Sequence, residues 1–160
     1  CVPLPSSKPA AHPVSHPARV DSITHAQTLT RHKRARVFGR VANIDSAAEQ
    51  VLDARAAGRF LAKDPEPRPG MRGGHIPGSL NLPYPALLGE HGTYKSAAEL
   101  QAAFDDAGIQ PGKPIATTCG SGVTACTLAL GLYLIGRDDV AIYDGSWSEW
   151  GARQDTPIES

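Results

Sequence analysis

The chain has 160 residues, and its 16 Lys and Arg balance its 16 Asp and Glu. This length fits one soluble globular domain with a buried core. The zero net charge gives no general reason to expect a nucleic acid or a membrane as a partner, and we expect neither. The 3 cysteines include no Cys-x-x-Cys pair, which argues against a disulfide scaffold or a zinc site. A reducing compartment is therefore favoured, with the cytoplasm as the default location.

The positive charge is concentrated at the start of the chain. Residues 1–40 hold seven Lys or Arg, four His, five Pro and a single acid, with little apolar periodicity. Such a segment buries too little apolar surface to offset its chain entropy. We therefore expect a disordered or loosely ordered head over 1–40 and one domain over 41–160. The basic run 31–36 lacks interleaved aromatics, so a solvated linker is favoured over a nucleic-acid arm.

Short apolar runs beyond residue 44 predict strands, because each is bounded by Gly, Pro or polar residues. The predicted strands are 49–55, 79–83, 113–118 and 140–144. Between them the pattern predicts helices. Ser96 and Glu99 form a capping box at the start of one, and Gly108 supplies its end. A compact turn or helix is expected at 56–60 and a strongly apolar helix at 123–136.

This alternation predicts an α/β fold with a parallel central sheet and helices on both faces. In such sheets, ligands bind beyond the carboxyl ends of the strands. Cys119 directly follows one predicted strand and precedes the apolar helix. A reactive group is expected at that position.

The loop "CGSGVTAC" suits a cysteine nucleophile. Backbone N–H groups of a Gly-rich loop that runs into a helix form a concavity that attracts an anion. The same field lowers the pKa of a thiol, and the thiolate is the reactive form. The small residues Gly120, Ser121 and Gly122 let the loop wrap around the sulfur and leave room for a second atom bonded to it. The alternative interpretation is a buried structural cysteine beside a glycine turn.

Four segments, "LDARAAGRF", "EPRPGMRGGHIPGSLNLP", "CGSGVTAC" and "YDGSWSEWG", together resemble the C-terminal, catalytic rhodanese domain of 3-mercaptopyruvate sulfurtransferases. The resemblance covers roughly residues 44–157. It implies a rhodanese-like domain in which Cys119 attacks the sulfur of 3-mercaptopyruvate and releases pyruvate. The resulting persulfide passes its sulfur to a thiol such as thioredoxin, or to cyanide. The resemblance implies no metal and no organic cofactor.

The resemblance also implies roles for individual residues. Arg59 and Arg68 match residues that hold the substrate carboxylate, a task that suits a guanidinium fork. Ser121 matches a residue that gives or relays a proton to the leaving enolate. Surface arginines and a turn-stabilising hydroxyl are the alternatives. The substrate-binding loop comprises Gly120, Gly122, Val123 and Thr124.

Donor choice is predicted from charge. Thiosulfate-specific relatives have two basic residues where this chain has Gly120 and Ser121. A dianion would benefit from those charges, so their absence favours 3-mercaptopyruvate, with thiosulfate as second choice.

Several conspicuous residues are expected to be structural. Arg55 is predicted to pair with Asp53 and stiffen the strand end. His75 is expected to bond to the backbone rather than act as a base. Cys126 is interpreted as core filler rather than a resolving thiol.

The two tryptophans of "YDGSWSEWG" are expected to pack a final helical turn behind the sheet. Trp147 and Trp150 are the residues concerned, and Ser146 is a candidate cap of that turn.

Two rival functions have weaker support in the sequence. Cysteine phosphatases use a Cys-x5-Arg loop, but Ala125 stands six residues after Cys119, which disfavours phosphate transfer and arsenate reduction. The second rival is a non-catalytic binding module. Two-domain relatives have an N-terminal rhodanese domain that contributes an acid and a histidine to the cleft. We expect no such domain in this sequence. We therefore expect either weak activity or dependence on a missing segment or a second chain.

Overall fold

The computed structural model describes residues 36–38 and 49–160. The expected head, apart from 36–38, lies outside the described residues. The strands are β1 (Arg36–Phe38), β2 (Gln50–Asp53), β3 (Leu80–Asn81), β4 (Ile115–Thr118) and β5 (Val140–Tyr143). The α-helices are α2 (Ala57–Phe60), α3 (Ala97–Asp106), α4 (Ala125–Leu134) and α5 (Ser146–Trp150). Two 3-10 helices, η3 (Tyr84–Leu87) and η4 (Glu90–Gly92), precede α3.

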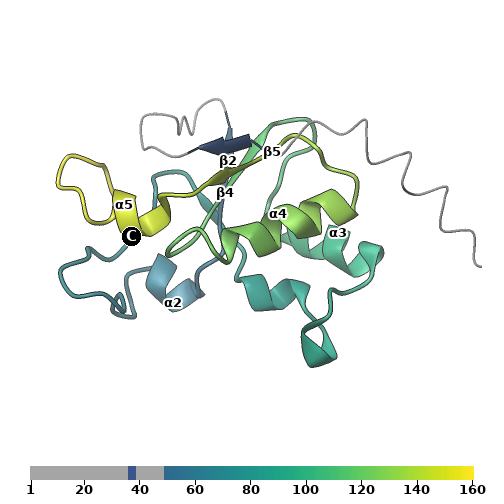
Figure 1. Ribbon diagram of the computed structural model, residues 1–160, viewed down its shortest axis with the longest axis horizontal. Coiled ribbons are helices and arrows are strands. Elements are labelled where there is room, and N and C mark those ends of the chain that lie inside the picture. The colour runs from purple at the N-terminus through teal and green to yellow at the C-terminus, as the bar shows by residue number, and fades with distance from the viewer. Residues whose placement is uncertain (1–35, 39–48) are drawn as a thin grey trace, which may run out of the picture. The chain divides into compact units, whose positions relative to one another are not determined.

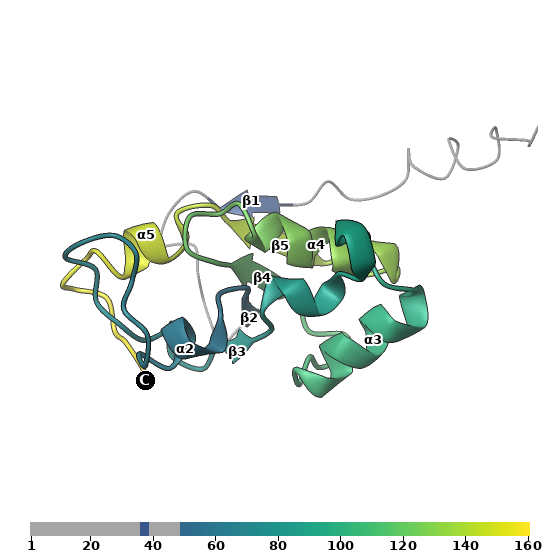
Figure 2. The same ribbon diagram turned by 90° about the horizontal axis from the view of Figure 1, so that it is seen from below.

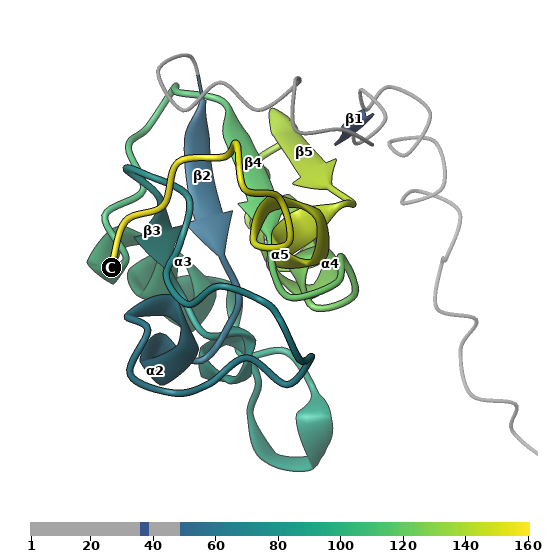
Figure 3. The same cartoon turned by 90° about the vertical axis from the view of Figure 1, so that its left-hand side faces the viewer.

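The strands form one sheet in the order β1-β5-β4-β2-β3, and every neighbouring pair is parallel. The predicted parallel α/β sheet is therefore confirmed. Because the strands are parallel, their carboxyl ends meet at one edge. Figure 1 and Figure 3 show α2 and α5 beyond that edge. The segments that follow β2, β4 and β5 are thereby brought together.

Side chains of alternate strand residues point to opposite faces of the sheet, and they form one core on each face. Leu52 and Ile115 point into the larger core, where Phe104 of α3 and Leu128 of α4 cover the sheet. Val51, on the opposite face, belongs to a smaller core that includes both tryptophans of α5. Figure 2 shows α3 and α4 grouped away from α2 and α5. Helical side chains thus cover both faces, as predicted.

The start and end of α3 follow the predicted local chemistry. The Ser96 hydroxyl accepts from the Glu99 N–H, and the Glu99 carboxylate accepts from the Ser96 N–H at 3.0 Å. This is the capping box expected from the sequence. The helix ends before Gly108, whose φ of +86° is the left-handed conformation that glycine adopts without strain.

The strand β1 was not predicted from the sequence. Its residues, 36–38, fall within the stretch assigned to the head, yet they pair with β5 from Arg36 opposite Ala141 to Phe38 opposite Tyr143. A run of three residues is too short to show strand alternation, so only the neighbouring strand reveals it. No helix among the described residues is long and apolar enough to cross a membrane.

Candidate active site

Cys119 is the first residue after β4, and it is 1% exposed. Its backbone is fixed by the start of α5. The Cys119 N–H donates to the Ser146 hydroxyl at 3.1 Å, and its carbonyl accepts from the Trp147 N–H at 2.9 Å. The next carbonyl, of Gly120, accepts from the Ser148 N–H and hydroxyl, at 2.9 and 2.6 Å. The segment that follows β5 therefore fixes the position of the loop that follows β4.

The thiol of Cys119 has a lowered pKa. Burial by itself raises the pKa, because desolvation disfavours the thiolate. Hydrogen bonds from the Thr124 hydroxyl, the backbone N–H groups of Ser121 and Ala125, and the Ser146 hydroxyl outweigh that effect. The backbone donors among these groups lie in the loop and at the start of α4, where the sequence predicts a concavity that attracts an anion. The site favours an anionic sulfur.

Gly122 lets the loop turn into α4. Its φ is +86°, and a Cβ at this position would lie 2.8 Å from the Asp144 carbonyl oxygen. Both the conformation and the close approach of backbone require glycine here. At Gly120 the absence of a side chain makes room for Arg59, because a Cβ there would lie 3.1 Å from its Nη2.

The prediction that Ser146 caps the last helix is wrong. The residue before the helix is Gly145, no side chain caps it, and Ser146 is the first helical residue with φ +49°. The hydroxyl of Ser146 instead has two acceptors within reach of its single proton, the Tyr143 carbonyl oxygen at 2.8 Å and Sγ of Cys119 at 3.9 Å. The left-handed backbone of a non-glycine residue is strained, and it aims the hydroxyl at the loop.

A pocket of about 290 Å³ opens beside the cysteine. It brings together six of the eight predicted site residues: Arg59, Cys119, Gly120, Ser121, Val123 and Thr124. Tyr84, which the sequence did not single out, also lines it. Gly122 is buried and contributes backbone geometry, whereas Arg68 lies in an adjoining pocket.

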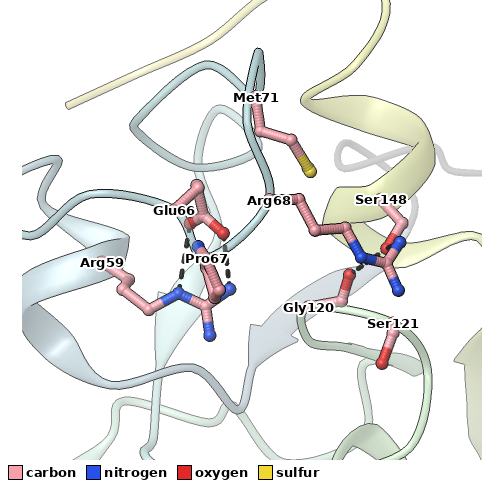
Figure 4. Close-up of a pocket in the computed structure, with 8 residues that line it drawn as sticks. All are labelled: Arg59, Glu66, Pro67, Arg68, Met71, Gly120, Ser121 and Ser148. Carbon is pink, nitrogen blue, oxygen red and sulfur yellow. Dashed lines mark hydrogen bonds and ion pairs between the residues drawn. The ribbon is translucent and has the colours of Figure 1, made fainter.

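The adjoining pocket, of about 140 Å³, contains both predicted arginines (Figure 4). They approach it from opposite sides in this view. Arg59 pairs with Glu66, with Nη2 and Oε2 2.5 Å apart. Arg68 donates to the Ser148 hydroxyl at 3.0 Å. Because that hydroxyl donates to Gly120, Arg68 is linked to the cysteine loop.

Glu66 and Ser148 are pocket residues that the sequence reasoning missed. Glu66 lies within "EPRPGMRGGHIPGSLNLP" and Ser148 within "YDGSWSEWG", two of the segments that carry the family resemblance. Nothing in local periodicity shows that either would face the cysteine loop.

The structural role predicted for Arg55 is confirmed. Its guanidinium pairs with Asp53 at 2.7 Å and with Glu66 at 2.8 Å, and it lies 4.3 Å above the ring of Trp147. The side chains of Arg55 and Asp53 are each 1% exposed. Arg55 therefore fixes the end of β2 from inside the protein.

The interpretation of His75 is also confirmed. Its Nδ1 lies 2.9 Å from the Phe60 carbonyl oxygen, to which it donates, and its ring stacks on Phe60 with the centroids 3.8 Å apart. Trp147 and Trp150 are buried in the smaller core, as predicted.

The interpretation of Cys126 as core filler is wrong, because Cys126 is exposed. Its thiol donates to the Gly122 carbonyl at 3.5 Å. The helix α4 turns Ala125, Leu128 and Leu132 inward. A helix that is apolar on nearly every side has no polar face, so its sequence does not show which residues point outward. Among the described residues, no cluster of His, Cys, Asp and Glu could hold a metal ion.

A cysteine whose pKa is lowered by hydrogen-bond donors of its loop lies at the carboxyl edge of the parallel sheet, so the fold and site define an α/β protein whose pocket favours an anionic thiol. The chain belongs to the rhodanese-like domain family, whose model matches residues 41–153.

Named relatives agree with this assignment. The 3-mercaptopyruvate sulfurtransferase of Rattus norvegicus is 43% identical over 155 residues, covering 95% of this chain and 48% of the relative. The thiosulfate sulfurtransferase of the same species is 44% identical over 144 residues, covering 89% and 48%. The crystal structure of SseA from Escherichia coli, a 3-mercaptopyruvate sulfotransferase, matches with TM-score 0.60 and 39% identity over 73% of this chain and 44% of that one. The chain thus spans about half the length of the relatives it matches.

Proposed function

We propose that this chain transfers sulfane sulfur from a small donor to a thiol through a persulfide on Cys119. The observation that carries the proposal is the lowered pKa of the Cys119 thiol within a loop of backbone donors. Those donors can hold either a thiolate or the persulfide anion that replaces it. Two relatives named for sulfur transfer, from 3-mercaptopyruvate and from thiosulfate, support the same reaction class.

In the first half-reaction, the Cys119 thiolate attacks the sulfur of 3-mercaptopyruvate. A sulfur–sulfur bond forms, the carbon–sulfur bond breaks, and its electron pair leaves on the enolate of pyruvate. Ser121, exposed at the rim of both pockets, is proposed to deliver or relay the proton that converts the enolate to pyruvate. In the second half-reaction, an acceptor thiolate attacks the outer sulfur and the Cys119 thiolate leaves.

The donor carboxylate is proposed to bind between Arg59 and Arg68. Both line the pocket next to the cysteine loop, and a guanidinium presents two parallel donors to a carboxylate. Thiosulfate remains the second donor, with sulfite as its leaving group. Neither Gly120 nor Ser121 brings the positive charge that a dianion would use.

The acceptor is proposed to be a thiol such as that of thioredoxin, in a cytoplasmic setting. Val123 is 73% exposed and Tyr84 is 37% exposed at the rim of the cysteine pocket, and we propose that an acceptor thiol approaches the buried Cys119 from that side. We further propose that residues 41–160, together with strand β1 (Arg36–Phe38) of the same sheet, form the catalytic domain. The relatives are about twice as long as the part that this chain matches, which leaves room in them for a second rhodanese domain. Such a domain would complete the pocket and raise a weak basal activity.

The test is release of pyruvate from 3-mercaptopyruvate in the presence of a thiol acceptor. Wild type should release pyruvate, and Cys119→Ser should release none, because serine cannot form a persulfide. Cys126→Ser, the same change at the exposed cysteine of α4, should keep the wild-type rate. Equal rates for wild type and Cys119→Ser would exclude the proposed nucleophile.

A further inference from the structure

Glu66 is a buried acid in the wall of a pocket that is expected to bind an anion. Its side chain is 2% exposed, and it lines the same pocket as Arg59 and Arg68. A carboxylate at this position opposes the binding of a negatively charged donor. Its presence therefore needs a reason, and its contacts supply one.

Glu66 joins two arginines. Oε1 accepts from Nη1 of Arg55 at 2.8 Å and from Nε of Arg59 at 3.3 Å, while Oε2 accepts from Nη2 of Arg59. Arg55 is itself fixed by Asp53 at the end of β2. The buried ion pairs thus run from the sheet to Arg59.

Arg59 lies at the end of this series, against the cysteine loop. Its Nη2 would be 3.1 Å from a Cβ on Gly120. Its side chain is 25% exposed, in contrast to the buried members of the series. Because Glu66 binds Nε and Nη2, the remaining nitrogen, Nη1, is left for a ligand in the pocket. Figure 4 shows Arg59 and Glu66 side by side with their two hydrogen bonds.

The charges of this cluster have a consequence for donor choice. Apart from the Cys119 thiolate, which both donors meet alike, Arg55, Arg59 and Arg68 carry three positive charges and Asp53 and Glu66 carry two negative ones, which leaves one net positive charge. A single carboxylate balances that charge, whereas a dianion exceeds it. Without the charge of Glu66, the cluster would carry two net positive charges.

We propose that Glu66 is a positioning and specificity-determining residue, which orients Arg59 and reduces the pocket charge to suit a monoanionic donor. The inference rests on the proposed function. It attributes to one buried acid the proposed preference of the pocket for a 2-oxo acid with a single carboxylate over thiosulfate.

The first test compares Glu66→Gln with wild type on the two donors. KM for 3-mercaptopyruvate should rise, because glutamine cannot accept from Arg59 with both terminal atoms. The ratio of kcat/KM for thiosulfate to that for 3-mercaptopyruvate should rise by about tenfold, from the added net charge. Asp106→Asn, an exposed change on α3 that also removes one negative charge, should leave the ratio unchanged.

Two further variants separate positioning from charge and from folding. Glu66→Asp keeps the charge but is one methylene shorter, so KM for 3-mercaptopyruvate should rise while the donor ratio stays near wild type. In an Arg59→Ala background, Glu66→Gln should no longer raise KM, because the residue acts through Arg59. If Glu66→Gln fails to fold, Glu66→Asp decides the positioning role.

The inference fails if folded Glu66 variants keep the wild-type KM and donor ratio while wild type acquires sulfur from either donor. It also fails if Glu66→Gln lowers kcat/KM equally for both donors, which is the result of a merely structural role. Absence of sulfur uptake by wild type itself would instead reject the proposed function, so the two failures are distinct.

Discussion

Replacing Gly122 with alanine tests whether the cysteine loop depends on a close backbone contact. A Cβ at Gly122 would lie 2.8 Å from the Asp144 carbonyl oxygen and 2.9 Å from its Oδ1. Gly136 offers a matched control, since it has the same φ of +86° and nothing within 4 Å of its Cβ position. The two substitutions therefore share the backbone strain and differ in the contact.

The magnitudes follow from these two terms. A left-handed alanine costs about 1–2 kcal/mol, which applies to both variants. Overpacking against fixed backbone adds about 1–3 kcal/mol, which applies to Gly122→Ala alone. Gly122→Ala should therefore be less stable than Gly136→Ala by about 1–3 kcal/mol. Urea unfolding of both variants measures this difference.

The same substitution should affect the thiol. Gly122 stands between two of the backbone donors, Ser121 and Ala125, that lower the pKa of Cys119. A displaced loop would weaken those hydrogen bonds, so the pKa should rise in Gly122→Ala and not in Gly136→Ala. The assay is the pH dependence of Cys119 alkylation, with the labelled peptide identified by mass. Equal stabilities and equal alkylation profiles for the two variants would refute the reasoning.

Three other predictions follow from the site. The alkylation midpoint of wild-type Cys119 should lie below that of an unperturbed thiol, and Ser146→Ala should move it upward by removing a donor to the sulfur; an unchanged midpoint in Ser146→Ala would exclude that hydrogen bond. Arg68→Ala should raise KM for 3-mercaptopyruvate by about tenfold and affect thiosulfate less, if the guanidinium binds the carboxylate; steady-state kinetics on both donors decide this. Ser121→Lys should raise thiosulfate use relative to 3-mercaptopyruvate beyond any change seen in Ser121→Ala, which lacks the hydroxyl but adds no charge.

Local sequence patterns were enough to predict much of the fold. The capping box at Ser96 and Glu99, and the apolar runs that became β2, β4 and β5, depend on neighbouring residues alone. The position of Cys119 followed from those strands, because a parallel sheet brings the ends of its strands to one edge.

Features that depend on contacts between distant segments were missed or misread. Glu66 contacts Arg55 across 11 residues, and the Ser146 hydroxyl reaches Cys119 across 27. Neither contact has a sequence period. Cys126 was placed in the core because the apolar sequence of α4 does not distinguish its two sides.

Intact mass of the wild-type protein, after brief exposure to 3-mercaptopyruvate and separately to thiosulfate, tests the central claim most directly. Peptide mapping then locates any added sulfur. The account predicts a gain of one sulfur atom on the Cys119 peptide, larger with 3-mercaptopyruvate and absent from Cys119→Ser. No gain from either donor, or a gain on the Cys126 peptide instead, would contradict it.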